Sequence, residues 1–436
     1  MLSAFRSALA TPDLRKKILF TLGIVAIYRL GANIPSPGVS YPNVQECIRQ
    51  VEGGDNAGVY SLINLFSGGA LLQLSILALG IMPYITASII VQLLTVVIPR
   101  FEQLKKEGQS GQNKLTQYTR YLTIALAILQ ATGIVALADR GQLFGNCTLP
   151  IIPDSGIFSL TIIVIVMTAG TAVVMWLGEQ VTERGIGNGM SLLIFASIAH
   201  RIPAEGKNIL DNSGPLVFAG VCFFGLAIIA SVVFVEQGQR RIPVQYAKRM
   251  VGRRMYGGTS TYLPLKVNQA GVIPVIFGSS LLYLPDLIAR LAGNEDGAFQ
   301  AFVRTYLVDQ SNWLHILLYI GLIIFFTYFY VGITFNPDER ADEMKKFGGF
   351  IPGIRPGRPT AEYLNYVLSR ITLPGSLYLG IIAVLPNFFL GITGSGQNQN
   401  FPFGGTAVLI MVGVGLDTVK QIESQLMQRN YEGFLR

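Results

Sequence analysis

Residues 63–81 read INLFSGGALLQLSILALGI, and this stretch decides how the whole chain is interpreted. It is apolar enough for a membrane, yet Ser67, Gly68 and Gly69 interrupt it. Residues 60–66, before the break, would form about two helical turns, which is too short to span a bilayer. A half-helix at membrane depth must be buried in protein or line a cavity, because lipid offers its backbone no hydrogen bonds. We therefore expect a re-entrant segment at about 60–72 that occupies an outer cavity; a helix lying on the membrane surface is the alternative.

The composition of the chain indicates a membrane protein. Only 13% of the 436 residues are charged, whereas 51% are hydrophobic. A soluble domain carries roughly 25% charged residues, so this deficit favours a polytopic membrane protein over a large soluble core. A spanning helix needs about 20 apolar residues. Ten stretches approach that length, at 18–34, 73–98, 121–138, 157–177, 187–202, 215–235, 270–289, 313–334, 371–391 and 403–420.

Lysine and arginine are distributed unevenly between the predicted loops. If the N-terminus is cytoplasmic, 26 of the 33 fall in cytoplasmic segments and 6 in outer loops, while Arg29 lies near a span end. Cytoplasmic loops carry the excess of Lys and Arg, so this asymmetry supports ten spans with both termini in the cytoplasm. The basic run at 15–17 precedes an apolar stretch without a small-residue cleavage site, which predicts an uncleaved first span rather than a signal peptide.

One membrane domain is expected over 1–436. The longest predicted cytoplasmic loops, 236–269 and 336–370, are basic and too short for separate folds. Ten spans can divide into halves at 1–202 and 203–436. With five spans each, the second half inserts in the opposite orientation, and such inverted repeats place the functional path at the interface between the halves. Ten unrelated helices are the alternative.

Charged side chains are nearly absent from the predicted span centres, which weighs against a proton-coupled carrier. No paired-carboxylate, nucleophile or metal-binding motif is visible, so no catalytic machinery and no cofactor are predicted. The run GIGNG at 185–189 lacks the Lys of a phosphate-binding loop, and a tight turn with close helix approach explains its glycines better. Isolated uncharged polar residues lie within the predicted spans, at Thr86, Gln92 and Gln130. They fit a weakly polar path, or hydrogen bonds that join helices.

The chain has three cysteines. Cys47 and Cys147 fall in predicted outer loops, where they can pair, and Cys222 lies in a span. Their spacing matches no metal site. The sequence leaves open whether Cys47 and Cys147 form a disulfide or remain isolated thiols.

Several long segments resemble the motifs of one known family. Residues 67–94, SGGALLQLSILALGIMPYITASIIVQLL, resemble the first signature of the SecY family of protein-conducting channels, in its bacterial form. Residues 175–195, MWLGEQVTERGIGNGMSLLIF, resemble the second. Further matches follow in the family's order at EQGQRRIPVQYAKR (236–249), LPLKVNQAGVIPVIF (263–277), PGIRPGRPT (352–360) and FGGTAVLI (403–410). The resemblance covers essentially the whole chain.

This resemblance implies an all-α polytopic membrane protein with ten transmembrane helices in two inverted five-helix halves around a central pore. A re-entrant plug helix would close the pore, at the positions Tyr60, Leu62, Ile63, Leu65, Phe66, Ser67, Gly68 and Gly69. A ring of apolar side chains would form its constriction, at Ile81, Ile85, Ile194, Ile276 and Ile410, with Ile273 as a sixth candidate. Spans 2 and 3 would meet spans 7 and 8 at a lateral gate into lipid, to which Thr86, Gln92 and Gln130 are assigned.

The implied function is that of a passive conduit for secretory polypeptides, which also releases transmembrane segments into the lipid. Such a channel is not an enzyme; the SecA motor ATPase or the ribosome drives it, SecE and SecG accompany it, and it lies in the bacterial plasma membrane. The docking positions for SecA or the ribosome correspond to Arg240, Arg241, Lys248, Arg249, Arg253, Arg254 and Arg355. Each of these charges could instead only set the topology. A secondary solute transporter with inverted repeats and a membrane-embedded enzyme are the alternatives; missing mid-span charges disfavour the first and missing catalytic groups the second.

Overall fold

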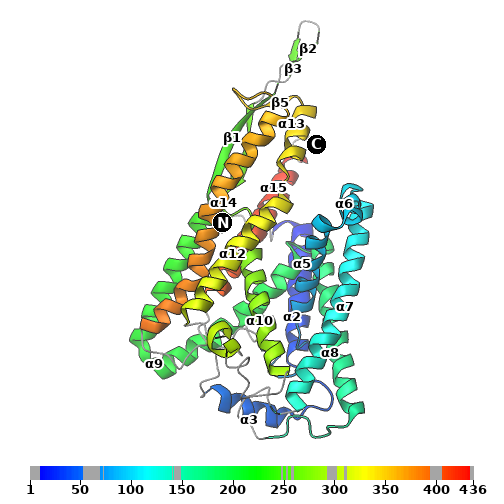
Figure 1. Ribbon diagram of the computed structural model, residues 1–436, viewed down its shortest axis with the longest axis vertical. Helices are drawn as coiled ribbons and strands as arrows, with labels where there is room; N and C mark the ends of the chain where they lie inside the picture. Colours follow the sequence, from blue (N-terminus) through cyan, green and yellow to red (C-terminus); the bar gives the residue numbers. More distant parts are fainter. Residues whose placement is uncertain are drawn as a thin grey trace.

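Long helices make up most of the chain, and a β arm extends beyond them at one end (Figure 1). The computed structural model describes residues 10–52, 69–71, 73–139, 141, 149–246, 249–251, 254–256, 260–291, 302–308, 312–392 and 405–432. The helices are α2 (Pro12–Ala32), α3 (Tyr41–Glu52), α5 (Met82–Val97), α6 (Pro99–Lys106), α7 (Gln109–Asp139), α8 (Ile157–Arg184), α9 (Gly189–Gln237), α10 (Ile273–Leu291), the π-helical η2 (Val303–Val308), α12 (Trp313–Thr334), α13 (Pro337–Lys346), α14 (Arg358–Ile392) and α15 (Gly405–Glu432). The strands are β1 (Gln239–Tyr246), β2 (Arg249–Val251), β3 (Arg254–Tyr256), β4 (Ser260–Lys266) and β5 (Gly349–Phe350).

All ten apolar stretches expected from the sequence coincide, wholly or in part, with helices: α2, α5, α7, α8, both parts of α9, α10, α12, α14 and α15. Two of them lie on α9, as Gly189–Pro203 and Gly214–Gln237. Gly214 breaks the helical path there with a φ of 83° and a ψ of 168°. Five of the described helices are long and apolar enough to cross a membrane, or six if α5 and α6 form one span bent by 100°.

The second predicted span begins later than its apolar sequence suggested. The apolar stretch predicted a helix over 73–98, but residues 73–81 form turns and α5 starts at Met82. Pro83 therefore occupies the first turn of α5, where its missing N–H costs nothing, and does not kink the span. The turns are tied to the segment after α2, because Ser36 N donates to Leu74 O (3.0 Å) and Ile76 N donates to Ile34 O (2.9 Å).

The arm between α9 and α10 contains a small antiparallel sheet, within the segment 236–269 that was predicted to be a basic cytoplasmic loop. β1 pairs with β4 along its whole length and with β5 at its far end, in the order β4-β1-β5. Ile242 and Val244 are buried, whereas Arg241 before them and Pro243 between them are exposed, which is the alternation of a half-buried strand. Pro243 is tolerated because β5 pairs only with Gln245 and Tyr246, so the other edge of β1 is free beside the proline.

The hydrophobic interior is divided into several clusters along the length of the molecule. One cluster lies at the end opposite the arm and joins α3 to α7 and α8. A central cluster joins α2, α5, α8 and the starts of α9, α10 and α15. A third fills the space between α9, α10, α12, α14 and α15, and a fourth packs the base of the arm on α12 and α14. The central cluster takes side chains from both predicted halves, as does a smaller cluster that joins Leu14 and Ile186 to Ile422.

Candidate functional site: an apolar cluster between the two halves

Five of the six isoleucines assigned to the pore ring meet in the central cluster. Ile81, Ile194, Ile276 and Ile410 are between 0% and 6% exposed, and Ile85 is partly buried against them. The cluster's other buried members are Ile24, Tyr28, Leu77, Val174, Met175, Leu177, Val181, Met190, Leu193, Ile198, Ala407 and Val414. The ring positions come from four helices that are far apart in the sequence, so the fold brings together what the motifs only suggested.

The ring isoleucines all lie at the beginnings of helices. Ile85 is the fourth residue of α5 and Ile276 is the fourth residue of α10. Ile194 is the sixth residue of α9 and Ile410 is the sixth residue of α15. In the expected order of ten spans, α5 and α10 are spans 2 and 7, and α9 and α15 begin spans 5 and 10. Equivalent positions five spans apart thus contribute equivalent side chains.

Ile273 does not join this cluster. It is the first residue of α10, one turn before Ile276, and it is half-buried. Residues three apart share a helix face, so Ile273 lies on the arm side of Ile276 rather than at the same level.

The junction between α8 and α9 places Ile194. The Thr182 hydroxyl donates to Gly178 O (3.0 Å) and accepts from Gly189 N (2.9 Å), and the Asn188 side chain caps α9 by accepting from Met190 N (3.1 Å). A Cβ on Gly189 would overlap Gly178 O, and Gly187 has a φ of +81°. The prediction of a tight turn with close helix approach in the GIGNG run is therefore confirmed.

Two buried hydroxyl groups beside the central cluster satisfy each other. The hydroxyl groups of Tyr28 on α2 and Ser197 on α9 form a hydrogen bond of 3.0 Å, and Ser197 also donates to Leu193 O. These residues lie 169 positions apart, and no sequence motif indicates that they pair.

The plug assignment falls almost entirely outside the described residues. Tyr60, Leu62, Ile63, Leu65, Phe66, Ser67 and Gly68 lie there, and only Gly69 is described. Gly69 has a φ of 92°, a left-handed conformation that other residues adopt only with strain. The glycine break thus marks a change of chain direction just before the turns that lead to Ile81.

The lateral-gate elements meet as the resemblance implies, although the three assigned residues make few contacts. α10 contacts both α5 and α7. Thr86 donates to Met82 O of its own helix (3.0 Å), and Gln92 and Gln130 are half-buried. At the arm-side end, Lys105 on α6 donates to Ile333 O (3.2 Å), so its ammonium lies at the C-terminus of α12, where the helix dipole favours a cation.

α6 itself carries a short ion pair at its surface. Lys106 Nζ lies 2.6 Å from Glu102 Oε1. This hydrogen bond lowers the pKa of Glu102 and raises the pKa of Lys106. Both side chains are exposed, so the pair contributes little to stability.

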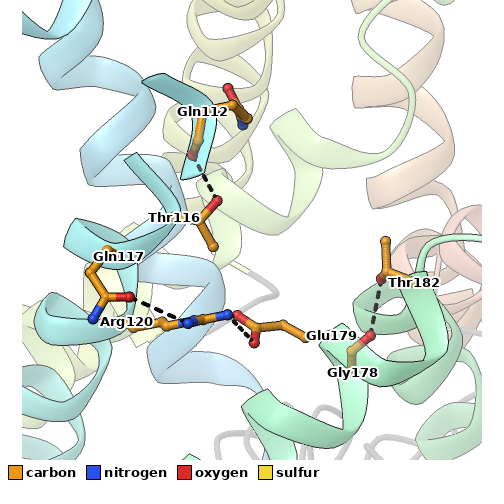
Figure 2. A network of polar contacts seen from close by, with 7 residues as sticks. All are labelled: Gln112, Thr116, Gln117, Arg120, Gly178, Glu179 and Thr182. Atoms are coloured by element: carbon orange, nitrogen blue, oxygen red, sulfur yellow. Dashed lines mark hydrogen bonds and ion pairs between the residues drawn. The ribbon is translucent and has the colours of Figure 1, made fainter. Parts of the chain in front are cut away.

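An ion pair joins α7 to α8, and no sequence motif indicates it (Figure 2). Arg120 Nε and Nη2 donate to Glu179 Oε1 (2.9 Å) and Oε2 (2.7 Å), a bidentate geometry, and Arg120 Nη1 also reaches Gln117 Oε1 (3.3 Å). Glu179 is one residue from Gly178, which supports the start of α9. The pair therefore holds α7 against the helix end that positions Ile194.

The basic residues of the arm are exposed where the structure describes their side chains. Arg240 and Arg241 lie on β1, and the Arg241 guanidinium stacks 4.9 Å from the ring centre of Tyr262 on β4. Only the backbone of Arg249 and Arg254 is described, on the paired strands β2 and β3. Lys248 and Arg253 lie outside the described residues.

Arg355 is held outward by a defined turn. It lies between Gly353 (φ +83°) and Gly357 (φ +104°), and its carbonyl accepts from the Thr360 hydroxyl (2.9 Å). Ile351 before it is buried in the cluster at the base of the arm. The Arg355 side chain is exposed. Its turn follows β5, which lies at the arm end of the molecule (Figure 1).

A multi-pass helical membrane protein with an apolar cluster between its two halves and an exposed basic face belongs to the class of helical channels and carriers. Among the described residues, no group of three or more His, Cys, Asp or Glu could hold a metal ion. The sequence model of the SecY family matches residues 75–419. The chain therefore belongs to the SecY family.

Named relatives match this sequence over its whole length. The chain is 73% identical to protein translocase subunit SecY of Mycobacterium tuberculosis and 64% identical to that of Streptomyces coelicolor, with complete coverage of both chains in each case. A solved protein-conducting channel shares the fold with a TM-score of 0.62 at 18% identity, over 94% of this chain and 91% of that one. Sec61 in the canine ribosome–channel complex does so with a TM-score of 0.58, also at 18% identity and with the same coverage.

Proposed function

We propose that this chain is the pore-forming subunit of a protein translocase. It would conduct secretory polypeptides across the membrane and release transmembrane segments sideways into the lipid, without catalysing a reaction of its own. The single observation that carries the proposal is the meeting of Ile81, Ile85, Ile194, Ile276 and Ile410 in one buried cluster between helices of both halves. Membership of the SecY family supports it.

The chemistry of the ring suits a passing polypeptide. Such a substrate varies in size and charge along its length, so the constriction must not bind any one side chain. Branched aliphatic groups offer it no hydrogen bonds, and an apolar constriction without substrate excludes water and ions by dewetting. A segment that passes the lateral gate then partitions by its own hydrophobicity, since each apolar residue contributes about −0.3 to −0.6 kcal/mol at the bilayer centre and each charge costs about 2.5 to 3.5 kcal/mol.

The division into halves at 1–202 and 203–436, with inverted orientation, belongs to this proposal. Its support is the matched position of Ile85 with Ile276 and of Ile194 with Ile410 along their helices. Residues 202 and 203 lie within α9, whose path breaks at Gly214. The plug at about 60–72 and the lateral gate between α5 and α7 on one side and α10 and α12 on the other complete the arrangement.

The arm and the Arg355 turn would dock the partner that drives translocation. The ribosome, whose RNA is anionic, or the SecA motor would bind this basic face, and SecE and SecG would accompany the chain in the bacterial plasma membrane. The supporting observations are the exposed Arg240, Arg241 and Arg355 at one end of the molecule, and the resemblance of the fold to a channel solved with a ribosome. The uneven distribution of Lys and Arg supports a cytoplasmic location for this face and for both termini.

Site-specific crosslinking of a translocating polypeptide tests the proposal. A photoreactive residue at 81, 85, 194, 276 or 410 should capture a stalled substrate in the reconstituted complex. The control position is Ile163, which is equally buried but lies in the cluster opposite the arm. Crosslinks at Ile163 and none at the ring would reject the pore assignment.

A second experiment distinguishes a channel from a solute transporter, the other candidate. When Ile410 is replaced by glycine, a channel should leak ions, whereas a transporter should not.

A further inference from the structure

The β1–β4 arm leaves the helices through a narrow base at the junction of α9 and α10 (Figure 1). On one side the base consists of the last turn of α9 and Gly238. On the other side it consists of Lys266 and the turn that leads to α10. The backbone closes the base, because Val267 N donates to Gly238 O (3.0 Å).

A buried polar pair joins the two sides of the base. Asn268 Nδ2 donates a short hydrogen bond to Glu236 Oε1 and a second one to Gly271 O (3.0 Å). The two side chains are only 3% and 8% exposed, respectively. Both N–H groups of the amide are therefore used, and they fix the end of α9 to the turn before α10. A buried carboxylate without such a donor would be costly, so this pair holds the two elements together firmly.

The base also packs closely on the neighbouring helices. A Cβ at Gly375 would overlap Val267 O, so α14 touches the backbone of the base directly. Lys266 Nζ lies 3.6 Å from Asp417 Oδ1 on α15. A Cβ at Gly413 would lie 3.0 Å from Val272 Cγ1, which places α15 against the start of α10 as well.

These contacts lead directly to two members of the pore ring. Ile276 follows Gly271 by five residues and lies in the first turn of α10. Ile410 precedes Asp417 by seven residues, which is two helical turns on α15. Interiors are close-packed and transmit displacement, so a rotation of the base moves the start of α10 and the part of α15 around Gly413 and Asp417 with it.

We propose that Glu236 and Asn268 are positioning residues that couple the docking arm to the pore ring. The inference rests on the proposed function, in which a cytoplasmic partner binds the arm and the ring forms the constriction. Binding force on the arm reaches Ile276 and Ile410 only if the base is rigid. The buried pair supplies that rigidity, and the more exposed Lys266–Asp417 pair adds to it.

The test separates docking from opening, in proteoliposomes that contain the complete channel complex. Asn268→Ala should leave the affinity for ribosomes within twofold of the wild type and should lower ribosome-driven translocation about tenfold. Glu236→Gln keeps an acceptor for Asn268 and should translocate almost normally. Asn336→Ala is the matched control, since it also removes a side-chain hydrogen bond on the arm side, at the cap of α13 and outside the base. Asp417→Asn, which leaves no buried cavity, should lower translocation two- to threefold even if Asn268→Ala does not fold.

Two results would overturn the coupling. The first is normal translocation by both Asn268→Ala and Asp417→Asn. The second is an equal loss of ribosome affinity and translocation, which would mean that the pair only supports the shape of the arm. The Ile410→Gly substitution gives an independent readout, because the ion leak that it causes does not depend on the arm. A channel that carries both Ile410→Gly and Asn268→Ala should therefore still leak ions. If the wild type itself failed to translocate, the proposed function would be contradicted instead.

Discussion

At Arg120 and Glu179, two full charges face each other between neighbouring spans. Both lie just outside the predicted apolar cores at 121–138 and 157–177, so the sequence placed them at loop ends. The helices extend further than the apolar cores, since α7 starts at Gln109 and α8 ends at Arg184. Their pairing across 59 positions therefore became apparent only in the fold.

Removing the carboxylate from this pair should loosen α8 against α7. Glu179→Ala leaves Arg120 without its bidentate partner, and we expect a loss of about 1 kcal/mol, small because the Arg120 side chain is 39% exposed. Thermal unfolding in detergent should shift downward by about 2 °C. Glu362→Ala is the control, because the Arg358–Glu362 pair is far more exposed and should change nothing measurable. Arg120→Lys should behave like Glu179→Ala, since an ammonium cannot replace the guanidinium fork; an unchanged midpoint in both variants would contradict this role.

Among the elements, the turn at Ile351–Gly357 and the strands of the arm differ in how well the sequence predicted them. Pro and Gly mark the turn at 352–357, and its conformation follows from local chemistry. The strands were missed, because the pairing of β1 with β4 joins residues up to 27 positions apart and β5 comes from a different loop. The alternation of Ile242 and Val244 with exposed neighbours was the signal that could have indicated β1.

Reversing the charge in the turn should affect docking alone. In Arg355→Glu the turn is kept, because its glycines and the Thr360 hydrogen bond involve the backbone. Partner-driven translocation should fall roughly tenfold, the effect of about 1.4 kcal/mol, while the insertion topology stays unchanged. Arg358→Glu, three residues further on and equally exposed, is the control. Normal translocation by Arg355→Glu in a motor-driven assay would remove this residue from the docking face.

α3 and the chain that packs on it form the other end of the molecule. Cys47 is disulfide-bonded, and Cys222 is a free thiol. The chain has three cysteines, and we expect Cys147, which lies outside the described residues, to be the partner of Cys47. Nearby contacts agree with such a link, since Asn43 Nδ2 donates to Pro150 O (2.7 Å) and Ser40 N to Ile151 O (3.0 Å).

The disulfide can be checked by alkylation and mass spectrometry. In the non-reduced protein, a thiol reagent should label Cys222 alone, and digestion should yield one linked peptide that contains Cys47 and Cys147. Cys47→Ala should free Cys147 for labelling and lower the unfolding midpoint, because a disulfide that closes a loop of about 100 residues stabilises by roughly 3–5 kcal/mol. Labelling of all three thiols without reductant would contradict the link.

Across the whole molecule, the sequence predicted what depends on local hydrophobicity and missed what depends on contacts between distant segments. The ten apolar stretches all coincide with helices, and the family motifs placed five ring isoleucines that do meet in the central cluster. The hydrogen-bonded pairs Tyr28–Ser197 and Glu236–Asn268 could be identified only in the folded structure, because no sequence motif links the two segments of either pair. The late start of α5 was also not predictable from the sequence. Residues 73–81 are mostly apolar, and it is their backbone hydrogen bonds to the segment from Ile34 to Ser36 that exclude a helix.

Four of the ring isoleucines lie within the first two turns of their helices and Ile81 lies directly before α5, and these positions have an electrostatic consequence. Gly187, just before α9, lies near Thr418, next to the Asp417 that pairs with the base of the arm. α9 and α10 therefore start on the arm side, whereas α5 and α15 start on the opposite side and run toward it. Four helix N-termini, each equivalent to about half a positive charge, thus flank the constriction from above and below. The current through Ile410→Gly channels should prefer chloride to potassium, which the reversal potential across a salt gradient measures; the fold would then protect the membrane potential against cation leak even when the apolar seal is incomplete.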